Sequence, residues 1–490
     1  MTHLDDNNIM AEKGRIDWFT VIIYLIFITL GWLNIYAASF DLESRTELFS
    51  LSGRAGMQLV WMSTALVLAF ILVKIDVAFY ETYALVFYLL GIGLLVLTLF
   101  VAANVRGSES FLDIGPIRIQ PAEFMKFLIA LALAKVFNTY GFNLMERKNL
   151  LLVSGLILLP LIIVILQKET GTALVYLVFI FVLYREGLPG GILFMGFAAI
   201  VYFVLGIKYS EVQWGMFSQG EVMVIILIII FTAGMVFSYM KRKSVSVFIF
   251  LAAGSIFLGA FVLSKFELEI DWGLTALIAL SVVVLYLIYL FIRFRKRTYL
   301  YILLFTIGSF VFLESVEYAF EEILEPHQKI RIEVLLGMKE DLRGAGYHVH
   351  QSKIAIGSGG LLGKGFLSGT QTKLNYIPDQ DTDFIFCTIG EEHGFVGSTA
   401  VMLLFVIFIL RLLYIAERQT SVFGRVYGYG VVSIFMFHLI INVGMVIGIM
   451  PVIGIPLPFF SYGGSSLWGF TILLFILLRI DKARKRGNFR

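Results

Sequence analysis

Apolar runs separated by short polar segments recur along the whole chain. The runs are about 18 to 23 residues long, and a helix of about 20 residues crosses the hydrocarbon core of a bilayer. Spans are predicted at 17–39, 57–75, 80–102, 120–138, 150–167, 170–184, 189–206, 222–240, 246–264, 273–292, 299–318, 384–410, 428–449 and 466–479. These fourteen spans predict an all-α polytopic membrane protein.

The composition narrows the function classes. Of the 490 residues, 59% are hydrophobic and 15% are charged, which excludes a soluble globular domain. A net charge of +3, without basic runs interleaved with aromatic residues, excludes a nucleic-acid partner. The single cysteine, Cys387, excludes an intrachain disulfide and a cysteine-based metal site. The polar, acidic start is unlike a cleaved signal peptide, so we expect the first span to be retained.

Basic residues are concentrated in every second loop along the chain. If the N-terminus is cytoplasmic, the inner loops and the tail hold Arg147, Lys148, Arg185, Lys241, Arg242, Lys243, Arg293, Arg295, Lys296, Arg297, Arg411, Arg418, Lys482, Arg484, Lys485 and Arg486. The opposite loops are mixed or acidic. By the positive-inside rule we expect both termini in the cytoplasm, and segment 319–383 outside it, where there is no ATP.

The composition of segment 319–383 argues against an unstructured linker. PHQKIRIEVLLG reads as a short amphipathic helix, and DLRGAGYHVHQSKIAIGSGG at 341–360 suits a segment folded onto the protein surface. GSGGLLGKG at 357–365 is not a phosphate-binding loop, because Ser358 and Gly365 stand where that motif needs Gly and Ser or Thr. His348 and His350 do not have a recognisable metal-ligand spacing on a helix.

Charged residues inside the apolar spans are the main candidate chemistry. Glu123 and Lys126 stand three apart on one helical face, which fits either a structural ion pair or the wall of a polar cavity, and we favour the cavity wall. Glu169 follows the fifth span at the predicted outer edge. At least one of Glu391 and Glu392 should face other helices or a cavity.

Two further segments lie near the last three spans. Asp379, Asp381 and Asp383 approach a helix start, where carboxylates serve equally well as caps or as functional groups. PVIGIPLPFFSYGGSS at 451–466 has three prolines and paired glycines, which predict a non-helical loop dipping into protein at membrane depth.

Together these motifs resemble the SEDS family of bacterial membrane proteins (shape, elongation, division, sporulation). The resemblance rests on IQPAEFMKF, LQKETGTALV, GAGYHVHQSKIAIGSGGLLGKGFLSGTQTKLNYIPDQDTDFIF, IGEEHGFVG and PFFSYGGSS, and within the family it favours the elongation branch, RodA, over the division branch. It implies a SEDS-type helical bundle with a ten-helix core, about four inserted helices and a long extracytoplasmic loop. The implied parts are a six-helix N-terminal core at 1–188, an inserted module at 189–292, a core helix at 293–318, the catalytic loop at 319–383, and a three-helix C-terminal core with a basic tail at 384–490.

The resemblance implies a peptidoglycan glycosyltransferase that polymerises lipid II into glycan strands during elongation. The implied partners are a class B penicillin-binding protein, lipid II, the nascent strand and elongation-complex membrane proteins, in the bacterial inner membrane. Asp341 is the implied catalytic carboxylate. The implied substrate-binding residues are Gln120, Glu123, Lys126, Glu169, Gln351, Lys353 and Ser461. A divalent cation, Mg or Mn, is the expected cofactor, with Glu123 and Glu169 as candidate ligands and no nucleotide.

The chain departs from the family pattern in places. GSESFLDIG at 107–115 lacks the arginines common before the fourth span, so a substrate-contacting cation is either missing there or replaced by Arg106 or Arg118. Glu169 stands where the family usually has aspartate, and Leu342 and Arg343 replace Pro-Leu after Asp341.

The expected reaction is a direct displacement with inversion. Asp341 would accept the proton of the attacking sugar hydroxyl as a general base, and Lys126 and Lys353 would stabilise the leaving pyrophosphate. Two other functions stay open: a flippase for lipid-linked precursors, which needs a polar path across the membrane, and a noncatalytic scaffold of cell-wall enzymes.

Overall fold

A computed structural model describes residues 15–40, 53–102, 110–115, 117–266, 268–318, 320, 322, 324, 326–339, 345–374 and 376–484. Asp341 lies outside the described residues. The helices of the first half are α1 (Trp18–Ser39), α2 (Arg54–Lys74), α3 (Val77–Val101), α4 (Pro121–Phe137), α5 (Arg147–Leu166), α6 (Thr170–Leu177) and α7 (Phe179–Arg185). A short antiparallel hairpin, β1 (Leu112–Ile114) and β2 (Ile117–Ile119), precedes α4.

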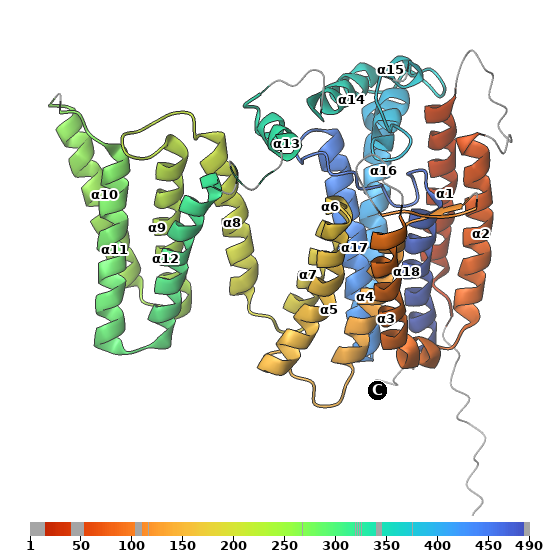
Figure 1. Ribbon diagram of the computed structural model, residues 1–490, viewed down its shortest axis with the longest axis horizontal. Coiled ribbons are helices and arrows are strands. Elements are labelled where there is room, and N and C mark those ends of the chain that lie inside the picture. The colour runs from red at the N-terminus through yellow and green to blue at the C-terminus, as the bar shows by residue number, and fades with distance from the viewer. Residues whose placement is uncertain are drawn as a thin grey trace, which may run out of the picture. The chain divides into compact units, whose positions relative to one another are not determined.

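The remaining elements are also helices. They are α8 (Gly190–Lys208), α9 (Gln219–Met240), α10 (Lys243–Ser264), α11 (Trp272–Phe294), α12 (Arg297–Tyr318), α13 (Pro326–Leu336), α14 (Ala345–Gly359), α15 (Thr370–Lys373), α16 (Ile385–Glu417), α17 (Val422–Val446) and α18 (Gly464–Ala483). Figure 1 shows this architecture. It confirms the predicted all-α polytopic membrane protein.

Twelve helices among the described residues are long and apolar enough to cross a membrane. Two of the fourteen predicted spans fall short of that length. The helix expected at 120–138 is α4, with 17 residues, and the one expected at 170–184 is divided at Val178 into α6 and α7. The number of crossings therefore stays a prediction.

Contacts divide the chain into two compact units, 1–189 with 342–490, and 190–341. In the first unit α17 packs against α4, α7, α16 and α18, and most of its side chains are buried in one hydrophobic cluster. A helix that is apolar on all sides is stable in this position because neighbouring helices cover every face. Figure 1 shows α14 and α15 at one end of this unit, where α16 begins.

The second unit has its own hydrophobic cluster, formed by α8 to α12. Helix α12 packs against α8, α9 and α11, and its Thr306 hydroxyl lies 2.8 Å from that of Thr232 on α9. The contacts thus group α12 with the predicted insert. Its assignment to the ten-helix core stays a prediction from the family resemblance.

Two segments of the predicted outer loop are helical. The amphipathic helix expected from PHQKIRIEVLLG is present as α13. The glycine-rich stretch that follows was expected to be loop, but 345–359 forms α14. Small residues explain the difference, because they let α14 approach α16 closely: a Cβ added at Gly359 would overlap the carbonyl oxygen of Gly390.

Candidate functional site

A buried lysine occupies the centre of the first unit. Lys126 on α4 is fully buried, and its Nζ lies 2.7 Å from Glu123 Oε2 and 3.2 Å from His438 Nε2 on α17. The same ammonium lies 4.7 Å from the centre of the Phe470 ring on α18. A carboxylate, an imidazole and an aromatic face therefore surround one cation, and the three contacts tie α4, α17 and α18 together.

The neighbours of His438 fix its tautomer. Its Nδ1 lies 3.0 Å from the carbonyl oxygen of Pro456, which can only accept a hydrogen bond, so Nδ1 carries the proton. Nε2 is then the acceptor facing Lys126. Sequence reasoning missed His438, although a histidine inside an apolar span is a signal of buried polar contacts.

The geometry favours the ion-pair interpretation of Glu123 and Lys126. Glu123 is 3% exposed and Lys126 0%, so neither carries surface that a substrate could touch in this conformation. Their assignment as substrate contacts stays a prediction. Glu123 also does not fit the role of a metal ligand here, because its carboxylate is paired with Lys126.

The residues at the start of α4 and α6 form contacts with neighbouring elements. The backbone N–H of Gln120 donates to Ser465 Oγ at 3.1 Å, and Ser110 Oγ donates to Glu169 Oε2 at 3.1 Å. The hydroxyl of Tyr176 donates to the carbonyl of Ala122 at 2.9 Å, which holds α6 against the turn that carries Glu123.

Arg118, the proposed substitute for the family arginines, lies on β2. Its Nε donates to Asp113 Oδ1 across the hairpin at 2.9 Å, and about half of each side chain is exposed. Arg106 lies outside the described residues. Among the described side chains, no cluster of three His, Cys, Asp or Glu residues could hold a metal ion.

The remaining predicted substrate residues fall into two groups. Gln351 and Lys353 lie on α14, and Lys353 is exposed. Ser461 instead is buried within the loop between α17 and α18. Its hydroxyl donates to the carbonyl of Thr382 at 2.6 Å and accepts from the N–H of Leu457 at 2.8 Å, so both hydrogen bonds stabilise that loop.

Of the segment 451–466 that was predicted to be a non-helical loop, residues 451–463 are non-helical and pack into protein, whereas 464–466 form the first turn of α18. Phe459 and Phe460 are buried, and a Cβ at Gly31 of α1 would overlap the Phe459 carbonyl. The amide of Asn442 donates to the carbonyls of Asp383 and Ile455, at 2.8 and 2.7 Å. Side chains thus satisfy this irregular backbone, as a low-dielectric setting requires.

The aspartates Asp379 and Asp381 before α16 make structural contacts. The Asp381 side chain forms an ion pair with Arg54, and the backbone carbonyl of Asp379 accepts from the N–H groups of Thr382 and Phe384. Both Glu391 and Glu392 are buried, which confirms the expectation that at least one faces protein. Glu391 forms an ion pair with Lys364, 2.7 Å away.

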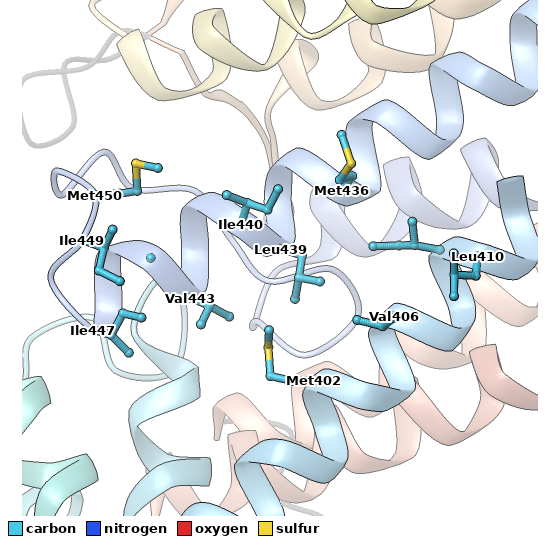
Figure 2. Close-up of a pocket in the computed structure, with 12 residues that line it drawn as sticks. Met402, Val406, Leu410, Met436, Leu439, Ile440, Val443, Ile447, Ile449 and Met450 are labelled. Carbon is cyan, nitrogen blue, oxygen red and sulfur yellow. The ribbon is translucent and has the colours of Figure 1, made fainter. Parts of the chain in front are cut away.

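A groove of about 450 Å³ lies between α16 and α17. Figure 2 shows Met402 and Val406 of α16 facing Leu439 and Val443 of α17. Every lining residue is apolar or glycine, so the groove offers no group for acid–base or charge-stabilising chemistry.

Comparisons with known proteins agree with this architecture. The sequence model of the FtsW/RodA/SpoVE family, described as "Cell cycle protein", matches residues 17–217 and 217–486. Peptidoglycan glycosyltransferase RodA of Treponema pallidum (strain Nichols) is 30% identical over 468 residues, covering 95% of this chain and 97% of the relative. Peptidoglycan glycosyltransferase MrdB of Escherichia coli (strain K12) is 49% identical over 145 residues, covering 30% of this chain and 39% of the relative.

A solved structure described as "Structural coordination of polymerization and crosslinking by a peptidoglycan synthase complex" has the same fold. Its TM-score is 0.60 at 22% identity, and the match covers 96% of this chain and 99% of the other. Given the family match over nearly the whole chain and the full-length similarity to the Treponema protein, this chain belongs to the SEDS (FtsW/RodA/SpoVE) family and resembles RodA.

Proposed function

We propose that this protein is a peptidoglycan glycosyltransferase that polymerises lipid II into glycan strands during cell elongation. The observation that carries the proposal is similarity along almost the full length to a relative named for this activity. The 145-residue match to a second such relative, at 49% identity, supports it.

The proposed reaction takes place on an activated lipid. The 4-hydroxyl of the acceptor sugar attacks the anomeric carbon of the donor, a C–O bond to the lipid pyrophosphate breaks, and the anomeric configuration inverts. Asp341 takes the hydroxyl proton as a general base, a role that typically contributes about 10² to 10⁴ in rate. Lys353, exposed on the helix that follows Asp341 in sequence, is proposed to stabilise the leaving pyrophosphate.

The proposed setting is the bacterial inner membrane, with both termini in the cytoplasm and the Asp341 segment outside. The proposed partner is a class B penicillin-binding protein, a transpeptidase that cross-links the new strands. The complex of polymerisation and crosslinking described for the similar structure supports such a partner. A dependence on Mg or Mn remains part of the proposal, with no ligand assigned and no step routed through the ion. Loss of polymerisation in EDTA and its recovery with either ion would test it.

Polymerisation and translocation can be separated in one experiment. Purified protein with its transpeptidase partner is given lipid II in detergent, and glycan polymer is resolved by electrophoresis. In parallel, the protein alone is placed in vesicles loaded with lipid II, and movement of the lipid between leaflets is measured. Polymer formation supports the proposed function; translocation without polymer would favour the flippase, and neither would favour a scaffold.

A further inference from the structure

One buried carboxylate holds the segment that follows α14. Glu391 of α16 is fully buried, and its Oε1 accepts from Lys364 Nζ at 2.7 Å, Thr370 Oγ1 at 3.2 Å and the N–H of Gln371 at 2.9 Å. Its Oε2 accepts from the N–H of Thr372 at 3.0 Å. Four donors from residues 364–372 therefore converge on one side chain, and charge-assisted hydrogen bonds of this kind are the strong ones.

A break in α16 adds backbone contacts to the same segment. Gly394 has φ 63° and ψ −162°, a conformation that is essentially restricted to glycine, so the helical hydrogen bonds are interrupted there. The N–H groups of Lys364 and Gly365 donate to the carbonyls of Glu391 and Glu392, at 3.0 and 2.9 Å. In return, the N–H of Phe395 donates to the Gly360 carbonyl at 2.9 Å. The break thus leaves backbone carbonyl and N–H groups of α16 available to form hydrogen bonds with residues 360–365.

These contacts anchor α14 at its C-terminal end. The helix ends at Gly359, packs against α16, and is attached to α17 by Ser352, whose hydroxyl donates to the Val446 carbonyl at 2.5 Å. Asp341 lies four residues before the first residue of α14. A helix transmits its orientation along its length, so the anchor at 359–372 also constrains the first turn of α14.

We propose that Glu391 is a positioning residue for glycosyl transfer: its carboxylate fixes segment 364–372 and, through it, the helix that follows Asp341. This inference rests on the proposed function. A positioning residue differs from a merely stabilising one because its loss slows the reaction of the folded enzyme. A misplacement of about 1 Å far from the reacting atoms can cost on the order of 100-fold in rate.

The ion-pair partner of Glu391 provides a matched pair of variants. Lys364→Met removes the cation that Glu391 binds and so weakens the anchor, whereas Lys364→Arg keeps the ion pair.

The experiment measures kcat and KM for lipid II polymerisation, together with hydrogen exchange of peptides covering 345–373, in the full chain with its transpeptidase partner. For Glu391→Gln and Lys364→Met we expect kcat to fall on the order of 10- to 100-fold, with faster exchange at 364–373. Lys364→Arg should stay within about twofold of the parent in kcat.

Two results would overturn the proposal. If residues 364–373 of Glu391→Gln exchange no faster than those of the parent, the carboxylate does not anchor the segment. If exchange accelerates but kcat of the folded protein is unchanged, the anchor is structural only. A parent protein that forms no polymer would instead refute the proposed function, and the exchange data would still decide whether Glu391 anchors the segment.

Discussion

At the scale of single residues, several buried charges among the described residues lie next to a group of opposite charge. Lys126 is the clearest case, with Glu123, His438 and Phe470 around its ammonium. The three-residue spacing placed Glu123 and Lys126 on one helical face, and of the two interpretations we favoured the cavity wall, whereas the structure shows the ion pair. The imidazole could not be predicted, because its contact joins residues 312 positions apart and depends on how α4 packs against α17.

Removing one member of this pair should destabilise the protein. Lys126→Met leaves the Glu123 carboxylate buried without its counter-charge, which typically costs about 3 to 5 kcal/mol. We expect a lower melting temperature in detergent for Lys126→Met, and partial recovery in the double variant Glu123→Gln/Lys126→Met. Unchanged stability combined with a large rise in KM for lipid II would instead support the substrate-contact interpretation.

A second ion pair should make stability depend on pH. Asp17, just before α1, is partly buried; burial alone would raise its pKa, but hydrogen bonds from Arg411 and Thr20 hold it below the ordinary value of 3.8. Because the folded state has the lower pKa, the stabilisation is present above about pH 4 and is lost as pH falls through the folded-state value. Asp17→Asn should reduce stability at pH 7 by about 1 to 3 kcal/mol.

The check is a melting curve at each pH. The difference in melting temperature between the parent and Asp17→Asn should be largest at neutral pH and should shrink below pH 4. A difference that stays constant down to pH 2.5 would show that the pair does not titrate as described.

At the scale of elements, hydrophobic patterning predicted the apolar helices well because each must fill or face an apolar surface. Hydrophobic patterning did not predict the break inside α16 or the polar helix α14. The turn at Gly394 inside α16 and the helix at 345–359 both depend on glycines that permit close backbone approach, and the neighbour that is approached cannot be read from local sequence.

The break in α16 should require glycine. An alanine at position 394 must adopt a strained backbone, and its Cβ would meet the backbone of Leu361 and Gly363. We expect Gly394→Ala to destabilise the protein by about 1 to 3 kcal/mol or more and to increase proteolysis at 360–373. Gly155→Ala is the control, because a Cβ there meets no atom within 4 Å. Equal protease resistance of the two variants would contradict the account of the break.

At the scale of the whole molecule, the charge pattern predicts which loops lie on each side of the membrane. This sidedness follows from loop charge and not from helix packing. The candidate site was predictable only in part for a related reason: motif resemblance indicates Asp341, Glu123 and Lys126, whereas the partners His438 and Lys364 depend on the packed fold.

Single cysteines would test the sidedness in intact cells. In a Cys387→Ser background, Leu362→Cys and Tyr140→Cys place thiols at strongly exposed positions on the predicted outer and inner sides. A membrane-impermeant maleimide should label Leu362→Cys only, and should label Tyr140→Cys after the cells are opened. Labelling of Tyr140→Cys in intact cells would contradict the topology and the outer position of the reaction.

The central claim is that this chain polymerises lipid II with Asp341 as the general base. The most direct measurement compares the parent with Asp341→Asn, each purified with its transpeptidase partner, in the rate of glycan polymer formation from lipid II. We predict polymer from the parent and a rate lower by about 10² to 10⁴ for Asp341→Asn at equal folding and complex formation. Equal rates for the two proteins would contradict the assignment of Asp341, and no polymer from the parent would contradict the function itself.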